Sequence, residues 1–270
     1  MIVWNLLRVA LHVLAGLIIC TMIFPRIDDA ARRAHVQRWS AALLRLFRVR
    51  LEVLRMDDEG SLVPVALPDA ASTPAAHGII VANHVSWLDN FVINSMQPCR
   101  FVAKSDIRDW PLLGTLCARA DTIFISRGSP RDVRKTFRSL VASVEAGDRV
   151  AFFPEGTTAA QGTLLPFHAN LFEAAIDAGV PVQPLAVRYL DAEGRFDPAV
   201  DYIGETTFLQ SMLVILRAPP VRAQILLLPL IPSTAAHRRV LAAAAHARIG
   251  AALGYDAAGA GCVERARAGV

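Results

Sequence analysis

Residues 78–89 read GIIVANHVSWLD, and this stretch decides the fold. It opens on a short apolar run, which is typical of a strand buried inside a sheet. Ser86, followed three residues later by Asp89, is a helix-start signature related to the capping box. We therefore expect a strand over 78–82 that turns into a helix, which is the repeating unit of α/β folds.

The rest of the chain repeats this alternation. Apolar runs of strand type, with helical stretches between them, occur at 100–103, 122–125, 149–153, 181–188 and 221–228. Ser129-Pro130 opens one of these helices and Gly147 closes it. Residues 233–253 are an alanine-rich helical stretch, and 57–77 form a loop rich in Asp, Pro, Ala and Ser. The pattern predicts an α/β fold with a mixed, largely parallel sheet flanked by helices.

The amino-terminal residues are strongly apolar. Residues 9–24 read VALHVLAGLIICTMIF, and with the flank from Met1 the run reaches about 20 residues, the span of a bilayer. The following PRIDDAARR is a poor match to a signal-peptide cleavage site, and a buried core helix stays an alternative. We favour a membrane anchor, spanning or re-entrant, followed by a basic amphipathic helix over 28–50. Residues 206–217 suit lipid contact and a buried helix equally well.

Charge and hydropathy favour a membrane over nucleic acid as the partner. The 270 residues are 54% hydrophobic with a mean hydropathy of +0.39, which is high for a soluble domain. Residues 1–50 carry eight Arg against two Asp, a net charge of +6, whereas the other 220 residues carry 20 basic and 22 acidic side chains. The arginines after the apolar run predict the inner membrane, with the following domain on the cytoplasmic side.

These patterns divide the chain into three parts. We expect a membrane-anchoring helical segment over 1–56, an α/β domain over 57–256 and a flexible tail over 257–270. The four cysteines are Cys20, Cys99, Cys117 and Cys262. They show neither C-x-x-C spacing nor a Cys/His cluster of zinc type, so we expect no metal site and a reducing compartment.

The histidine and aspartate of NHVSWLD suit acid–base chemistry only if the backbone turns between them. In one continuous helix, His84 and Asp89 would lie about 140° apart and would not meet. If the helix begins at Ser86, the carboxylate can fix the imidazole tautomer and favour its protonated form. In the alternative, Asp89 only caps the helix and His84 only bonds nearby backbone. Spacing alone leaves both open, since His168 and Glu173 are also five residues apart.

Two downstream stretches carry polar groups at strand ends. FFPEGTT at 152–158 places Glu155 and Gly156 after an apolar strand. The glutamate could accept hydrogen bonds from a polyol, and the glycine lets backbone approach a ligand, although a solvated turn acid is the alternative for Glu155. TIFISRGSPRD at 122–132 ends a strand at Arg127, just before a helix start, which suits an anion.

The motifs NHVSWLD, TIFISRG, FPEGT and VPVQPLAV occur in this order, with RFVAKSDIRDWPLLG between the first two. In this combination the chain resembles the 1-acylglycerol-3-phosphate acyltransferase family of lysophospholipid acyltransferases, over about 75–190 and more weakly through 206–232. The resemblance implies the glycerolipid acyltransferase fold, which is a mixed α/β sheet with helices on its faces and an amino-terminal membrane-embedding helical pair.

The resemblance also implies roles for single residues. His84 would be the catalytic base and Asp89 the group that orients it. The residues implied in substrate binding are Arg127, for a head-group phosphate, together with Glu155, Gly156, Thr157 and Lys104.

The implied reaction is transfer of a fatty acyl group from acyl-CoA or acyl carrier protein to a lysolipid hydroxyl, as in 1-acylglycerol-3-phosphate, with no cofactor. The sequence has no G-x-S-x-G elbow, which fits direct transfer, with backbone N–H groups near the helix start as donors to the oxyanion. Many phosphatidate-forming members carry arginine after FPEGT, where this chain has Thr158. The acceptor therefore stays open between lysophosphatidate and a lyso-ornithine lipid. A thioesterase-like hydrolase and a non-catalytic lipid-binding protein are the competing hypotheses.

Overall fold

The sheet organises the structure, a computed structural model that describes residues 2–65, 78–110, 112–125 and 130–255. Its strands are β1 (Val49–Met56), β2 (Leu62–Pro64), β3 (Gly78–Ala82), β4 (Arg100–Lys104), β5 (Ile123–Ile125), β6 (Arg149–Phe152), β7 (Val182–Leu190) and β8 (Val221–Leu227). Within the described residues these strands form one eight-stranded sheet in the order β2-β1-β8-β7-β3-β6-β4-β5. Neighbours run parallel except for the antiparallel pairs β1–β2 and β7–β8. The expected mixed, largely parallel sheet is confirmed.

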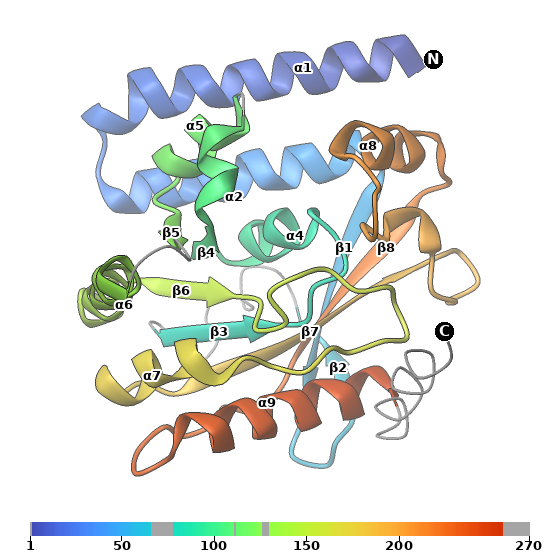
Figure 1. Cartoon of the computed structure of the whole chain (residues 1–270). Helices are drawn as coiled ribbons and strands as arrows, with labels where there is room; N and C mark the ends of the chain where they lie inside the picture. Colours follow the sequence, from blue (N-terminus) through green and yellow to red (C-terminus); the bar gives the residue numbers. More distant parts are fainter. Residues whose placement is uncertain (1, 66–77, 111, 126–129, 256–270) are drawn as a thin grey trace, which may run out of the picture.

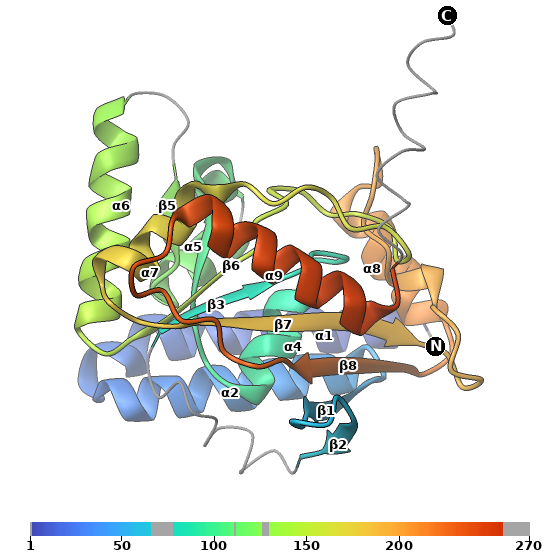
Figure 2. The same ribbon diagram turned by 90° about the horizontal axis from the view of Figure 1, so that it is seen from below.

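Helices cover both faces of this sheet. They are α1 (Ile2–Ile18), α2 (Asp29–Leu46), α4 (Asp89–Met96), α5 (Leu113–Arg119), α6 (Pro130–Glu145), α7 (Glu173–Asp177), α8 (Phe208–Arg217) and α9 (Arg238–Leu253). In Figure 1, α1, α2, α4 and α8 lie on one side of the sheet and α7 and α9 on the other, and Figure 2 shows α9 crossing the strands. Every residue of β3 is buried, because both of its faces are covered, so the strand reads as an unbroken apolar run.

Two strands lie where the sequence suggested helix and loop. β1 occupies residues counted in the amino-terminal helical segment, and β2 lies inside the expected loop 57–77. α2 ends at Leu46, and Arg48 then takes a φ of +59°, the left-handed conformation that stops a helix. The sequence VRLEVLRM alternates in the manner of a half-covered strand, with Val49 and Val53 buried. The helical periodicity of the preceding residues hides this signal.

The amino-terminal helix continues past α1 through a π-helical turn (Ile19–Ile23) and a 3-10 turn (Phe24–Arg26). Among the described residues, Ile2–Arg26 is the one helical run long and apolar enough to cross a membrane. Only 17% of its most apolar window is buried, so this helix is not a core helix of the fold. The apolar amino-terminal helix is confirmed, and its role as a membrane anchor stays a prediction.

α1 and α2 form an antiparallel pair (Figure 1), and a stack of two rings is one of the contacts between them. The rings of His12 and Trp39 stack with centroids 4.5 Å apart. Trp39 Nε1 donates to the carbonyl of His12 at 3.1 Å, and His12 Nε2 lies 3.0 Å from the carbonyl of Trp39. α2 begins at Asp29 because the Asp28 carboxylate accepts the N–H of Ala31. The pair is therefore tied together by polar contacts as well as by packing.

The carboxyl-terminal helices start slightly later than the patterns suggest. α8 begins at Phe208, after a capping box in which Thr207 and Gln210 satisfy one another's backbone N–H groups. α9 begins at Arg238, five residues after the expected start at 233, and ends at Gly254 with a φ of +71°.

Candidate active site

The polar cluster of the molecule begins where β3 ends. Asn83 is buried at the first position after the strand. Its side-chain amide donates to the Val187 carbonyl at 2.9 Å, and its oxygen accepts the Val187 N–H at 2.7 Å. The side chain thus stays bonded to β7 while the following backbone leaves the sheet. His84 starts that turn at the carboxyl end of a parallel strand, where open α/β sheets place their sites.

His84 and Asp89 meet across this turn. His84 Nδ1 lies 2.8 Å from Asp89 Oδ2, and the same oxygen accepts the backbone N–H groups of Val85 and Ser86 at 2.8 and 2.9 Å. The Asp89 side chain is fully buried, whereas the imidazole is 19% exposed. The carboxylate therefore orients the ring and holds the turn at once. The structure shows the paired arrangement and not the alternative, since Asp89 makes no side-chain cap of α4 and the His84 ring bonds a carboxylate.

The helix begins later than its sequence signature suggests. α4 starts at Asp89, not at Ser86, and the buried Ser86 hydroxyl has no hydrogen-bond partner among the described residues. Because the N–H groups of Val85 and Ser86 bond Asp89, they are not available as donors to an oxyanion. The expected helix start at Ser86 is wrong, and donation to an oxyanion by other backbone N–H groups near the helix start stays a prediction.

Tyr189 is a further member of the cluster that the sequence did not indicate. Its hydroxyl, carried by β7, donates to Asp89 Oδ1 at 2.6 Å, and both residues are fully buried. Burial first, and then the negative charge of Asp89, raises the pKa of Tyr189 well above its ordinary value. The phenol therefore stays protonated and remains a donor. The register that sets β7 beside β3 brings it here, and no local sequence pattern shows that register.

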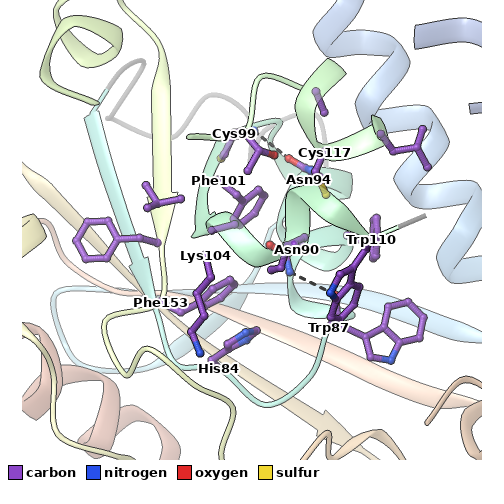
Figure 3. A pocket seen from close by; sticks show the side chains of 18 of the residues that line it. His84, Trp87, Asn90, Asn94, Cys99, Phe101, Lys104, Trp110, Cys117 and Phe153 are labelled. Atoms are coloured by element: carbon purple, nitrogen blue, oxygen red, sulfur yellow. Dashed lines mark hydrogen bonds between the residues drawn. The ribbon is translucent and has the colours of Figure 1, made fainter. Parts of the chain in front are cut away.

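The imidazole of His84 rests on an aromatic ring. The rings of His84 and Phe153 stack with centroids 3.9 Å apart and planes 7° apart, and Phe101 stacks on the far side of Phe153 at 5.9 Å. Figure 3 shows His84, Lys104 and Phe153 close together in the pocket. Because Phe153 holds the ring plane and Asp89 holds Nδ1, the imidazole has one defined orientation, and the other ring nitrogen is left for substrate.

Glu155 holds backbone. Its Oε1 accepts the N–H of His84 at 2.7 Å and its Oε2 accepts the N–H of Leu165 at 2.8 Å. The residue is 4% exposed and does not line the pocket that His84 lines. Burial raises the pKa of Glu155 to about 7, against the opposing effect of the two N–H donors. In this geometry Glu155 positions the His84 turn, and acceptor binding by this carboxylate stays a prediction.

Three of the four other residues expected at the site line the pocket that contains His84. Gly156 has a φ of +71°, which favours glycine, and a Cβ there would lie 3.4 Å from His168 Cδ2. Gly156, Thr157 and Lys104 line the same pocket as His84. Arg127 lies outside the described residues.

A pocket of about 610 Å³ connects His84 to the amino-terminal helices. Its wall comes from α1, α2, α4, β4, α5, the loop after β6 and the start of α8, and it is mostly apolar and aromatic. Trp87, Trp110 and Phe208 belong to this wall, and the sequence did not single them out. A cavity of this kind suits an apolar chain with its reactive end at His84.

Three thiols line this pocket, and none is activated. Burial raises the pKa of Cys20 to about 11 and that of Cys99 to about 12, and it also raises the pKa of Cys117. These thiols therefore stay protonated near neutral pH, and a protonated thiol is a poor nucleophile. The pocket thus offers a positioned base without a thiolate beside it.

Fold and site together define a class of protein: an α/β protein whose oriented histidine, at the end of a parallel strand, opens onto a large apolar pocket. Comparison with known proteins agrees. The family model described as Acyltransferase matches residues 66–188. The chain is 44% identical over 117 residues to the 1-acyl-sn-glycerol-3-phosphate acyltransferase of Neisseria gonorrhoeae, a match covering 43% of this chain and 46% of that protein.

A second relative is matched over a longer span. The chain is 36% identical over 191 residues to the lyso-ornithine lipid O-acyltransferase of Pseudomonas aeruginosa, covering 71% of this chain and 73% of that protein. The crystal structure of the 1-acyl-sn-glycerophosphate acyltransferase PlsC from Thermotoga maritima shares the fold, with a TM-score of 0.57 at 15% identity over 92% of this chain and 96% of that one. The chain belongs to the 1-acylglycerol-3-phosphate acyltransferase (lysophospholipid acyltransferase) family, as its motifs predict.

Proposed function

We propose that this chain is an O-acyltransferase of membrane lipid biosynthesis. It moves a fatty acyl group from a thioester, acyl-CoA or acyl carrier protein, to the free hydroxyl of a lysolipid. The observation that carries the proposal is the His84–Asp89 contact of 2.8 Å beside an apolar pocket of about 610 Å³. Family membership supports the proposal, because the relatives from Neisseria gonorrhoeae and Pseudomonas aeruginosa are named as acyltransferases.

His84 acts as the base in this reaction. Asp89 occupies Nδ1, so Nε2 takes the proton of the lysolipid hydroxyl as its oxygen attacks the thioester carbonyl carbon. The new C–O bond forms, the C–S bond breaks, and the leaving thiolate takes the proton back from the imidazolium. Asp89 stabilises the imidazolium, and Tyr189 in turn stabilises the carboxylate. The step needs no acyl-enzyme, and the protonated thiols in the pocket have no part in it.

The acceptor is a lysolipid, and two head groups compete. The Neisseria relative is named for 1-acylglycerol-3-phosphate and the Pseudomonas relative for a lyso-ornithine lipid. Thr158 stands where many phosphatidate-forming members carry arginine, and its hydroxyl donates to the Tyr202 carbonyl. That contact ties the loop to its neighbour and brings no positive charge to the pocket. The match to the Pseudomonas relative is the longer of the two, and Thr158 adds no charge for a phosphate. Both observations favour a lyso-ornithine lipid as the acceptor.

The protein works at a membrane, since both lysolipid and product reside there. α1 and the π-helical turn after it present an apolar side outward: the exposed large side chains are Val3, Trp4, Leu7, Leu11, Leu14 and Ile18 of α1 and Met22 of the turn. The proposal puts the domain on the cytoplasmic side of the inner membrane, and the arginine-rich residues that follow α1 support this orientation. This side of the molecule also carries the pocket, so substrates need not cross water.

The proposal is tested by acyl transfer with a panel of acceptors. Membranes containing the protein receive labelled acyl-CoA, or labelled acyl carrier protein, with lysophosphatidate, lyso-ornithine lipid or no acceptor. His84→Ala should lower product formation by roughly 100-fold or more, because a positioned base contributes about that factor. The matched control is His237→Ala, which changes an exposed histidine at the start of α9 and should leave the rate near that of wild type.

The outcomes of this assay distinguish an acyltransferase from a hydrolase. Product that depends on His84 and on one acceptor establishes the reaction and the head group. Free fatty acid that ignores added lysolipid would show a hydrolase instead. If neither donor gives product with any acceptor, or if His84→Ala matches wild type, the acyltransferase proposal fails.

A further inference from the structure

Two segments that are distant in sequence meet at one wall of the pocket. Trp110 follows the 3-10 segment Ser105–Asp109, and Phe208 is the first residue of α8. Their rings touch edge to face with centroids 6.3 Å apart, and both rings line the pocket. The described residues make no backbone hydrogen bond between the two segments. A side-chain contact of this kind is worth about 0.5–1.5 kcal/mol, so Trp110 is held only weakly to Phe208, which also packs on Trp87 with ring centroids 4.9 Å apart.

A large exposed leucine stands beside each of these rings. Leu112 is 56% exposed and Leu209 is 57% exposed, and neither lines the pocket. Each leucine therefore shows its side chain to the outside near an aromatic residue of the pocket wall, and Trp110 is itself 39% exposed. Together they give this part of the pocket wall an apolar outer rim.

The backbone at Leu112 is strained to hold that side chain outward. Leu112 has a φ of +63° and a ψ of −53°, a conformation that costs a bulky residue about 1–3 kcal/mol. Exposure to water returns no hydrophobic gain for this cost. The turn is also tightly seated, because a Cβ at Gly114 would lie only 2.1 Å from the Arg108 carbonyl oxygen. Strain of this kind, in a well-seated turn, points to a function for the exposed leucine.

The elements that carry the rim pack against the amino-terminal helix. α1 contacts both α5, which Leu112 precedes, and α8, which carries Leu209. Figure 1 shows α1, α5 and α8 on the same side of the sheet. α1 carries the exposed apolar residues that the proposed function assigns to the membrane. The turn at Leu112 and the first turn of α8 therefore lie next to the helix that the proposed function assigns to the membrane.

We infer that the Trp110–Phe208 contact is a lateral portal, through which the lysolipid passes directly from the leaflet into the pocket, with Leu112 and Leu209 inserted in the lipid as its rim. The inference rests on the proposed function. The occupant of the rim is a phospholipid leaflet, because the rim lies next to α1 and because an apolar acceptor must enter an apolar pocket. The two rings separate as the acyl chain of the lysolipid slides between them.

The first test needs no activity. Leu112→Cys and Leu209→Cys are labelled with a polarity-sensitive dye and mixed with vesicles of phosphatidylcholine and phosphatidylglycerol in equal parts. Val240→Cys is the matched control, since Val240 is 61% exposed but lies on α9, on the opposite side of the sheet (Figure 1). Each is compared with wild-type protein taken through the same labelling. Vesicles should shift the emission of the dye at 112 and 209 to shorter wavelength and leave the dye at 240 unchanged. No shift at 112 and 209 overturns the inference.

The second test separates entry from chemistry. Leu112→Asp and Leu209→Asp are assayed with a long-chain lysolipid in those vesicles and with a short-chain lysolipid dissolved in water, beside Val240→Asp. The rim variants should lose at least about tenfold in kcat/KM on vesicles and little on the soluble acceptor, because a charge in lipid is costly. Equal rates on vesicles for rim variants and wild type would refute the portal. Failure of wild type on both acceptors would instead count against the proposed function, while the dye measurement still decides the rim.

Discussion

At the scale of single residues, the site depends on how many donors share one carboxylate. Asp89 receives His84 Nδ1 and two backbone N–H groups on one oxygen, and the Tyr189 hydroxyl on the other. Tyr189 touches no reacting atom, so it is a positioning residue that acts through Asp89. Its hydrogen bond to a charged group is the kind that contributes about 1.5–3 kcal/mol.

Tyr189→Phe should therefore lower the rate although the residue touches no reacting atom. Without the phenol, one oxygen of Asp89 loses its donor, so the carboxylate is held less firmly and orients the imidazole of His84 less well. We expect kcat to fall by about tenfold, in line with the loss of one hydrogen bond to a charged group, and KM for the lysolipid to change little. The measurement is kcat and KM for wild type and variant.

Tyr255→Phe is the control for this substitution. It makes the same chemical change at a buried hydroxyl that has no hydrogen-bond partner among the described residues. Its kcat should match that of wild type. A Tyr189→Phe variant with the kcat of wild type would show that the hydroxyl only packs.

The sequence could predict part of this cluster and not the rest. His84 and Asp89 are five residues apart on one turn, so local spacing and motif were enough to pair them. Tyr189 lies 100 residues away, and Asn83 bonds Val187 at a separation of 104. Contacts of that range depend on strand register, which a single sequence does not state. Glu155 was found by its motif, but burial turns both of its oxygens toward backbone.

At the scale of secondary-structure elements, the packing of α1 on α2 depends on a glycine. Gly16 lies where a Cβ would come within 2.6 Å of Trp39 Nε1, which is too close for any real contact. Trp39 cannot simply move, because its ring stacks on His12 and its Nε1 is hydrogen bonded. Gly16 and Trp39 also line the pocket, so this contact shapes the cavity as well as the helix pair.

Gly16→Ala gives a prediction whose sign is informative. Helix propensity alone would stabilise the protein by about 1 kcal/mol, because alanine is the better helix former. We expect destabilisation by about 1–3 kcal/mol instead, since the added methyl overpacks the α1–α2 interface. The measurement is unfolding of the protein in detergent micelles, with proteolysis between the two helices as a second readout.

The chain offers a matched control on another helix. Gly250 is a buried glycine of α9, and a Cβ there would meet Leu164 Cδ2 at an ordinary 3.6 Å. Gly250→Ala should leave the free energy of unfolding unchanged or raise it, because alanine is the better helix former. If Gly16→Ala behaves like Gly250→Ala, the close approach to Trp39 does not limit the packing of α1.

The elements that the sequence predicted well are those that packing covers completely. Fully buried β3 and the expected strand at 149–153 were recognisable as apolar runs, and β3 has the bounds expected. β1 was not recognised, because the helical periodicity of the residues before it hides its alternation, and β2 has only three residues. Helix starts were displaced where the chain uses side-chain caps, such as His237 for α9, that general patterns rank low.

At the scale of the whole molecule, the amino-terminal helices and the pocket lie on one side of the sheet. Glu155 connects the His84 turn of this pocket to the backbone at Leu165. Its two oxygens bond the His84 turn and Leu165, so its charge state affects both. The ionised form makes these bonds but is buried, and burial raises its pKa to about 7. The folded protein therefore binds a proton at Glu155 more tightly than the unfolded chain does.

This linkage sets a direction for stability against pH. Because the folded pKa is about 7 against an ordinary 4.5, the stabilisation from the protonated group is complete below pH 4.5 and is lost as pH rises through 7. The shift corresponds to on the order of 3 kcal/mol. Glu155→Gln cannot titrate, and its amide can accept only one of the two N–H groups. The unfolding free energy of wild type minus that of Glu155→Gln should therefore fall by on the order of 3 kcal/mol as the pH rises from about 5 to about 8.

The measurement is chemical unfolding in detergent micelles at a series of pH values for both proteins. Glu145→Gln is the control, since Glu145 is an exposed residue at the end of α6, and its difference from wild type should show no such fall. A constant difference between wild type and Glu155→Gln would mean that Glu155 does not titrate between these limits. Its burial would then be fully offset by the two N–H donors, and the site would keep its carboxylate ionised throughout the working range of His84.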